Sequence, residues 1–316
     1  MPYGRLSSPN PVSPGSSRYD PRSVIDPDRT TATIYRGHVR LATIRTDGAT
    51  RAVRIDATSD AGTGAVELDA EDVGDVLRRD GWREWAAMAD GPSSALGGLD
   101  FAPLITRPDK IVCVGLNYRT HIREMGHEFP EHPTLFAKYR AALIGANDDI
   151  VLPAASTSVD WEAELAVVIG TAVRHASVTD AEAAIAGYSV LNDVSVRDFQ
   201  RRTSQFLQGK TFEASTPLGP WLVTPDEMPD LRREISCEVN GVEMQRANTS
   251  DLVFDPVAIV RYVSSIITLE PGDVIATGTP GGVGAARTPP VFLQSGDQVV
   301  TRIDGVGELR NTCRPE

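Results

Sequence analysis

From residue 160 to the C-terminus, most apolar segments are short and strand-like, which limits the folds open to this chain. The strand-like segments are ELAVVIG, AGYSVLND, ISCEVNG, DVIATGT and QVVTRIDGVGELRN, and two helical segments interrupt them, VTDAEAAIA and DPVAIVRYVSSIITL. A doubly wound sheet needs a helix after nearly every strand, and the sequence lacks this alternation. No period of roughly 20 to 50 residues repeats, which argues against solenoids and propellers. The pattern therefore predicts a β-rich α+β fold.

The first third of the chain divides into a leader and a small module. Residues 1–28 are rich in Pro, Ser and Gly and contain no apolar segment of a secretion signal, so we predict a disordered leader. Residues 29–103 combine strand-like alternation around an Asp47-Gly48 turn with the helical segment DAEDVGDVLRRDGWREWAAMA, and predict a small α/β module. Residues 104–316, with the buried strand Ile111–Gly115 near their start, form the predicted main domain.

Charge and composition argue against several kinds of partner. The 316 residues contain 31 Lys and Arg against 43 Asp and Glu, a formal net charge of −12. Nucleic acid is not expected as a partner, because phosphate binding needs clustered cations. A membrane is not expected either, since no apolar run approaches the roughly 18–20 residues of a membrane helix. Cys113, Cys237 and Cys313 lie far apart in the sequence and predict reduced thiols in a cytoplasmic protein.

The segment VDWEAELAVVIG places two glutamates at the start of a buried strand. Glu162 and Glu164 are two positions apart, so in an extended chain their side chains point to the same side. Two such carboxylates suit Mg²⁺, Mn²⁺ or Ca²⁺ better than zinc, although spacing alone also fits a pair of surface glutamates. Asp193, at the end of another apolar strand, either completes a three-carboxylate metal site or is a turn residue at the strand end.

Other polar residues have a functional and an ordinary interpretation. In GLNYRTHIREMG, His121 and Glu124 are three apart and share one face of a helical turn, where the carboxylate could orient the imidazole to activate water. From the spacing alone, the solvated polar face of a short helix is the favoured interpretation. Lys210 could face an anionic substrate or a developing oxyanion, but most lysines are simply solvated. The same alternatives hold for Arg197 and Lys138.

Two segments resemble known motifs but do not match them. Residues 276–287, ATGTPGGVGAAR, lack the GK[ST] ending of a phosphate-binding loop and the helix that should follow it. They remain a plausible Gly-rich turn that passes close to a ligand. Residues 127–132, HEFPEH, are one residue too long for the zinc-protease motif HExxH, and Pro130 interrupts a helix.

Taken in order, a series of segments over about residues 106–312 resembles the fumarylacetoacetate hydrolase superfamily. These segments are VGLNYRTHIREMG, LFAKYRAALIG, DWEAELAVVIG, NDVSVRDFQ, GKTFEASTPLGPW, VNGVEMQRANTSDLVF, LEPGDVIATGTPGGVGAAR and GDQVVTRIDGVGELRN. The resemblance implies a mixed β-roll catalytic domain, usually a homodimer. It also implies cleavage or isomerisation of 2-oxo or 2-enol dicarboxylic acids with Mg²⁺ or Mn²⁺ as cofactor.

Matching the motifs position by position implies a role for each candidate residue. The implied metal ligands are Glu162, Glu164 and Asp193. The implied catalytic residues are His121 and Glu124, as a water-activating dyad on a lid, and Lys210, which would face the substrate. The implied substrate-binding residues are Arg197, Gln200, Lys138 and Thr279, of which Thr279 lies in the Gly-rich loop.

The resemblance leaves the reaction open. We expect an enzyme of aromatic catabolism or of oxaloacetate disposal. The interpretation that we place first is a metal-dependent hydrolase that cleaves a carbon–carbon bond in acylpyruvates, of the fumarylpyruvate or fumarylacetoacetate type. The alternative is an oxaloacetate decarboxylase or a 2-hydroxy-dienedioate isomerase that uses the same site. A protein of a different class, which keeps the fold and binds without turnover, is disfavoured by the intact set of acids, His121 and Lys210.

Overall fold

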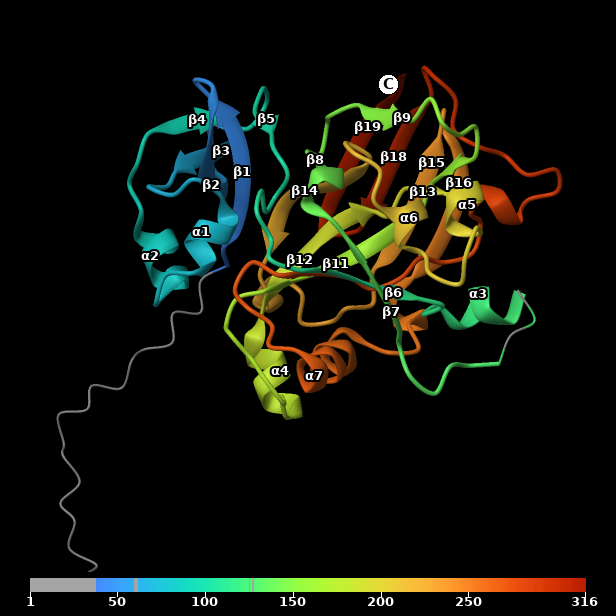
Figure 1. Cartoon of the computed structure of the whole chain (residues 1–316). Helices are drawn as coiled ribbons and strands as arrows, with labels where there is room; N and C mark the ends of the chain where they lie inside the picture. The colour runs from blue at the N-terminus through green and yellow to red at the C-terminus, as the bar shows by residue number, and fades with distance from the viewer. Residues whose placement is uncertain (1–37, 60–61, 125, 127) are drawn as a thin grey trace, which may run out of the picture. The chain divides into compact units, whose positions relative to one another are not determined.

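The computed structural model describes residues 38–59, 62–124, 126 and 128–316, and Figure 1 colours the chain from blue to red in sequence order. The predicted leader, residues 1–28, lies outside the described residues. Strands predominate over helices in the described part, so the predicted β-rich α+β class is confirmed. Within those ranges no helix is long and apolar enough to span a membrane.

The largest sheet has twelve strands. They are β1 (Arg40–Thr46), β2 (Ala49–Ser59), β3 (Gly62–Glu67), β4 (Ser93–Ala95), β5 (Asp100–Phe101), β6 (Ile111–Gly115), β7 (Thr134–Lys138), β8 (Leu143–Ile144), β11 (Ala163–Ile169), β12 (Ile185–Asn192), β14 (Thr216–Val223) and β17 (Val274–Ala276). Their order is β4-β3-β2-β1-β14-β12-β11-β17-β6-β7, with β5 beside β1 and β8 beside β14. Because β1 pairs with β14, the strands of the predicted N-terminal module continue the sheet of the predicted catalytic domain.

A second sheet has five strands in the order β16-β15-β18-β19-β9. Its strands are β9 (Ile150–Leu152), β15 (Glu234–Val239), β16 (Val242–Asn248), β18 (Gln298–Ile303) and β19 (Gly307–Pro315), and a separate short pair consists of β10 (Val159–Asp160) and β13 (Ser195–Val196). Leu165 and Val167 of β11 share one hydrophobic cluster with this sheet, while Ala166 and Val168 belong to the cluster of the N-terminal module. Strand β11 is thus buried on both faces, which explains its continuous apolar run.

The helices are short. They are α1 (Val73–Leu77), α2 (Trp82–Met88), α3 (Arg119–Glu124), α4 (Val178–Ala184), α5 (Arg197–Gln200), α6 (Leu207–Lys210) and α7 (Pro256–Ile266), with 3₁₀ turns at Arg140–Ala142, Pro225–Glu227, Thr249–Asp251 and Gly284–Ala286. Helices α4 and α7 pack against each other (Figure 1), and both correspond to predicted helical segments. The single helical segment predicted in the module is instead two helices, because Gly81 between them has a left-handed φ of 64°.

Sheet order determines where the functional segments meet. Strand β11 runs antiparallel to both β12 and β17, and β17 runs parallel to β6. The N-terminal end of β11 therefore lies at the same edge as the C-terminal ends of β12, β17 and β6. The segments that follow these three ends carry Asp193, the Gly-rich loop and helix α3, and the N-terminal end of β11 carries the two glutamates.

Candidate active site

A cavity of about 540 Å³ lies at this edge of the sheet. Most of the candidate residues line it. They are His121, Glu162, Glu164, Arg197, Gln200, Lys210 and Thr279. The rest of the lining contains apolar side chains, among them Phe136 and Phe206, and the polar side chains of Arg201 and Thr203. Five separate segments of the chain thus bring polar groups into one partly apolar space.

Glu162, Glu164 and Asp193 form a buried acidic triad whose ligand atoms all lie within 4.8 Å of one another. The backbone explains the convergence. Pairing of β11 with β12 sets Ala163 opposite Asn192, and the next amide, Asp193 N, donates to Glu162 O at 2.8 Å. Glu162 and Glu164 then contribute side chains from one strand end, as their spacing predicted.

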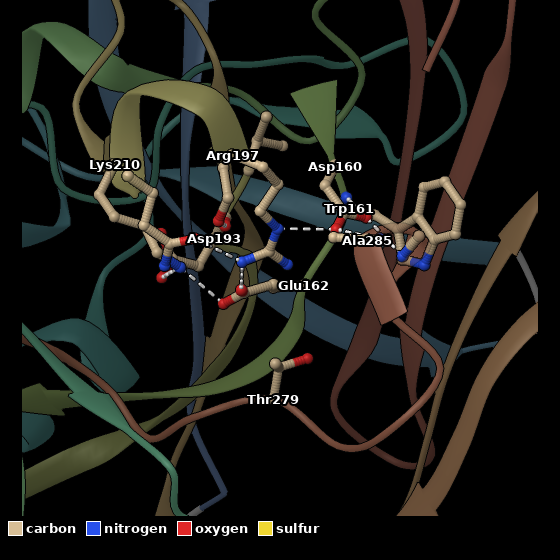
Figure 2. Close-up of polar contacts among 12 residues, drawn as sticks. Asp160, Trp161, Glu162, Asp193, Arg197, Lys210, Thr279 and Ala285 are labelled. Atoms are coloured by element: carbon tan, nitrogen blue, oxygen red, sulfur yellow. Dashed lines mark hydrogen bonds and ion pairs between the residues drawn. The ribbon is translucent and has the colours of Figure 1, made fainter. Parts of the chain in front are cut away.

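Two members of the triad are paired with buried cations. Lys210 Nζ lies 2.7 Å from Glu162 Oε2 and 2.7 Å from Asp193 Oδ2, and Arg197 Nη1 lies 2.7 Å from Glu162 Oε1 (Figure 2). Lys138 Nζ lies 2.6 Å from Asp193 Oδ1. Burial by itself raises the pKa of Asp193, but Lys138 and Lys210 lower it below its ordinary value. Such pairing makes the burial of these charges tolerable.

Glu164 differs from the other two acids. Its Oε2 accepts a hydrogen bond from Gly278 N at 2.7 Å, and among the described residues it forms no ion pair with a lysine or arginine. Burial, followed by the charges of Asp193 and Glu162, raises the pKa of Glu164 well above its ordinary value. Among the described residues, the site therefore holds one carboxylate that is not in direct contact with a lysine or arginine.

The donor set fits a divalent cation. Carboxylate oxygens are the ligands that Mg²⁺ and Mn²⁺ prefer, and three of them converge here. Four buried acids, Asp160 and the triad, stand against three buried cations, Lys138, Arg197 and Lys210. The excess negative charge, on Glu164, is the charge that a bound divalent cation would offset.

Asp160 was not predicted from the sequence, yet it organises the wall of the cavity. Its carboxylate accepts hydrogen bonds from Arg197 Nε at 2.7 Å, Gly284 N at 2.7 Å and Ala285 N at 2.9 Å (Figure 2). Only its place directly before the two glutamates, as a third acid in VDWEAE, distinguishes it in the sequence. Arg197 is thereby held between Asp160 and Glu162, and its Nη2 is buried with no hydrogen-bond partner in the described part of the chain.

The remaining candidates occupy different positions. Gln200 Oε1 accepts from Arg197 Nη1 at 2.9 Å, and Thr279 Oγ1 accepts from Gln245 Nε2 at 2.8 Å. Lys138, predicted to bind substrate, does not line the cavity; its fully buried ammonium lies against Asp193 and the Val194 carbonyl oxygen. Its observed contacts are therefore with a member of the acidic triad and not with the cavity.

His121 lies on α3, is 9% exposed and lines the cavity. Glu124 is the last residue of α3, and its side chain lies outside the described part of the structure. The predicted dyad of His121 and Glu124 therefore stays a prediction. The position of His121 on the cavity wall supplies an imidazole within the same space as the triad.

The chain is similar to known proteins in sequence and in fold. The family model described as fumarylacetoacetate (FAA) hydrolase C-terminal matches residues 110–314. "Oxaloacetate tautomerase FAHD2A, mitochondrial" of Bos taurus is 49% identical over 214 residues, which cover 67% of this chain and 68% of the relative.

Two solved structures share the fold at moderate identity. Fumarylacetoacetate hydrolase from the psychrophile Exiguobacterium antarcticum matches with a TM-score of 0.77 and 32% identity, over 88% of this chain and 100% of that one. The 2-hydroxyhepta-2,4-diene-1,7-dioate isomerase from Mycobacterium marinum matches with a TM-score of 0.72 and 34% identity, over 88% and 99%. Proteins named as a hydrolase and as an isomerase thus share this fold.

Proposed function

Because the chain belongs to the fumarylacetoacetate hydrolase family, we propose that it is a divalent-metal-dependent tautomerase or isomerase of small 2-oxo diacids. Isomerisation was one half of the alternative considered from the sequence, beside oxaloacetate decarboxylation, and it now replaces acylpyruvate hydrolysis as the first choice. The support comes from relatives: the bovine protein is named an oxaloacetate tautomerase and the Mycobacterium marinum protein an isomerase. Acylpyruvate hydrolysis becomes the second candidate, because a similar solved structure is named a hydrolase.

The observation that carries the proposal is the buried triad, whose Glu162 and Glu164 line a cavity that also contains the imidazole of His121. Glu162, Glu164 and Asp193 would hold a divalent cation, which would supply Lewis-acid polarisation of a 2-oxo group and so acidify the adjacent C–H. The cytoplasmic location and the homodimer stay predictions, as does the choice between Mg²⁺ and Mn²⁺.

The protein groups account for the movement of one proton. His121 takes a proton from the carbon next to the oxo group, and the electron pair of that C–H bond becomes a C=C bond. The former oxo oxygen carries the developing negative charge, which the ammonium of Lys210 stabilises. Return of the proton to that oxygen gives the enol, and return to a more distant carbon of a conjugated diacid gives an isomer. The buried, unpartnered Nη2 of Arg197 donates to a substrate carboxylate.

The apolar part of the cavity favours proton transfer over hydrolysis. Phe136 and Phe206 lie edge to face, with ring centroids 5.6 Å apart, and both line the cavity. Lys210 Nζ lies 5.1 Å from the centroid of the Phe136 ring, so this apolar wall adjoins the charged site. A wall of this kind limits the number of water molecules around a bound substrate.

The proposal is tested by identifying the products that the metal-stripped protein forms before and after addition of Mg²⁺ or Mn²⁺. Oxaloacetate, a 2-hydroxyheptadienedioate and an acylpyruvate serve as substrates. With oxaloacetate we expect the enol absorbance to fall and C3 to take up deuterium from D₂O. Both changes should depend on the metal, and no new acid should form. If the only efficient reaction is cleavage of the acylpyruvate into pyruvate and a second acid, hydrolysis would replace the proposed reaction. Carbon dioxide from oxaloacetate as the main product would replace it with decarboxylation.

His121→Ala tests the assignment of the proton-transfer group. We expect a rate loss of about 10²- to 10⁴-fold with unchanged metal affinity, because the imidazole is not a member of the triad. His132→Ala is the matched control, since His132 is exposed, stacks on Tyr262 and does not line the cavity. Equal rates in His121→Ala and the wild type would remove His121 from the mechanism.

A further inference from the structure

The described residues place three lysine or arginine side chains on the cavity wall, Arg197, Lys210 and Arg201. The first two are committed to carboxylates, Arg197 to Asp160 and Glu162 and Lys210 to Glu162 and Asp193. Arg201 is different: its side chain is exposed, and within the described ranges its guanidinium makes no hydrogen bond or ion pair. It is a cation in the cavity that no protein acid neutralises.

The backbone holds Arg201 one helical turn beyond Arg197. Arg201 N donates to Arg197 O at 3.1 Å, and Arg201 is the C-cap of α5. Residues four apart on a helix lie on the same face, with Cβ atoms about 5–6 Å apart. Arg197 contacts Glu162 of the triad, so Arg201 stands one turn further along the same wall.

The end of α5 is also fixed against α6. The backbone of Gly209 packs so closely on Gln200 that a Cβ at Gly209 would lie 2.4 Å from Gln200 N. Gln200 directly precedes Arg201, and Lys210 directly follows Gly209. The contact therefore sets Arg201 in a defined position relative to the lysine that reaches the triad.

The charges of the side chains that line the cavity indicate the charge of its ligand. The acids that line the cavity in the described part of the chain are Glu162 and Glu164, and protein cations already pair with Glu162. A divalent cation at the triad would more than offset Glu164, so the guanidinium of Arg201 would add to a positive excess. A ligand with a second negative charge, remote from the triad, matches this arrangement.

We propose that Arg201 binds the distal carboxylate of the substrate and makes the enzyme selective for 2-oxo diacids over 2-oxo monoacids. This inference rests on the proposed function, because it assumes that the 2-oxo acid end of the substrate lies at Glu162, Glu164 and Asp193. A guanidinium forms two parallel charge-assisted hydrogen bonds with a carboxylate, which a monoacid with a methyl group at that end cannot accept.

The next residue provides a matched control. Arg202 has its guanidinium carbon 3.4 Å from the centroid of the Phe199 ring and its Nη2 3.8 Å from Asp198 Oδ2. It does not line the cavity. Arg201 and Arg202 thus carry the same charge on adjacent positions of one exposed segment, and only Arg201 faces the cavity.

The experiment compares Arg201→Gln, Arg201→Lys and Arg202→Gln with the wild type in the presence of Mn²⁺. Deuterium exchange at C3 is followed for oxaloacetate and for 2-oxobutyrate, which has a methyl group in place of the distal carboxylate. For Arg201→Gln we expect KM for oxaloacetate to rise about tenfold to hundredfold, with little change in kcat/KM for 2-oxobutyrate. Arg201→Lys should recover part of the loss, and Arg202→Gln should match the wild type.

Two results would overturn the inference: an unchanged diacid preference in Arg201→Gln, or an equal loss in Arg202→Gln. Failure of the proposed function is a separate outcome, in which the wild type exchanges deuterium in neither compound but cleaves acylpyruvates. The same variants are then compared on fumarylpyruvate and acetylpyruvate, which differ in a distal carboxylate. Loss of preference for fumarylpyruvate in Arg201→Gln alone would support the role of Arg201, and an unchanged preference would refute it.

Discussion

Arg197 and Asp160 form a buried ion pair, with Arg197 Nε 2.7 Å from Asp160 Oδ2. The same carboxylate accepts the backbone N–H groups of Gly284 and Ala285, in the turn that forms another part of the cavity wall. Asp160 therefore couples α5 to that turn and orients the guanidinium that contacts Glu162. It acts on the site through Arg197, as a positioning residue.

Asp160→Ala should destabilise the protein strongly. Removing one partner of a buried ion pair typically costs about 3–5 kcal/mol in the free energy of unfolding. Here Arg197 keeps Glu162 as a partner, but the buried N–H groups of Gly284 and Ala285 also lose their acceptor. Urea denaturation measures the change. Asp230→Ala is the control, because Asp230 is 62% exposed and lies 3.8 Å from Arg232; its effect should be far smaller. Equal losses of stability in the two variants would mean that the buried Asp160–Arg197 pair stabilises the fold no more than an exposed ion pair does.

Glu164→Gln should have opposite effects on stability and on metal binding. The amide is isosteric, can accept the hydrogen bond from Gly278 N, and removes a buried charge that protein cations do not pair. The melting temperature of the metal-free variant should be higher than that of the wild type. Added Mn²⁺ should raise the melting temperature of the wild type and leave that of the variant unchanged, because ligand binding stabilises by mass action.

Differential scanning calorimetry with and without Mn²⁺ makes this comparison. Glu182→Gln, at an exposed position of α4, serves as the control and should keep the wild-type response to metal. A metal-induced rise in the melting temperature of Glu164→Gln would refute the assignment of Glu164 as a ligand.

Gly209→Ala should disturb both stability and activity. The added Cβ would lie 2.4 Å from Gln200 N and 2.5 Å from Gln200 Cα, so α5 and α6 must separate. Overpacking of this kind costs about 1–3 kcal/mol, and here it also moves Arg197 away from Lys210. Thermal unfolding and kcat report the two effects. Gly97→Ala, where no atom lies within 4 Å of the new Cβ, should change neither.

The three cysteines should be unreactive in the folded protein. Cys113, Cys237 and Cys313 are free and buried. Burial raises the pKa of Cys313 to about 12 and also raises the pKa values of Cys113 and Cys237. Because the thiolate is the reactive form, a disulfide reagent at pH 8 should label none of them before unfolding and all three in urea. Rapid labelling of one thiol in the native protein would show that its surroundings open to solvent.

Local patterns in the sequence were sufficient to predict many elements. The predicted strand Ile111–Gly115 has the observed bounds of β6, and the turn at Asp47-Gly48 joins β1 and β2. Spacing of two on an extended chain also placed Glu162 and Glu164 on one side, where they meet in the triad. These features depend on residues within a few positions of one another, so side-chain periodicity and turn preference determine them.

The charge partners depended on tertiary structure. Lys210 and Arg197 come from segments far from Glu162 in the sequence. Their contacts with Glu162, and the contact of Arg197 with Asp160, exist because β11 lies between β12 and β17 in the sheet. The same packing places the ammonium of Lys138, predicted to contact substrate, against the buried carboxylate of Asp193. Sequence spacing identifies which side chains share a face of one element. Only the order and direction of distant strands decide which faces meet, because that order is set by long-range packing of the whole core.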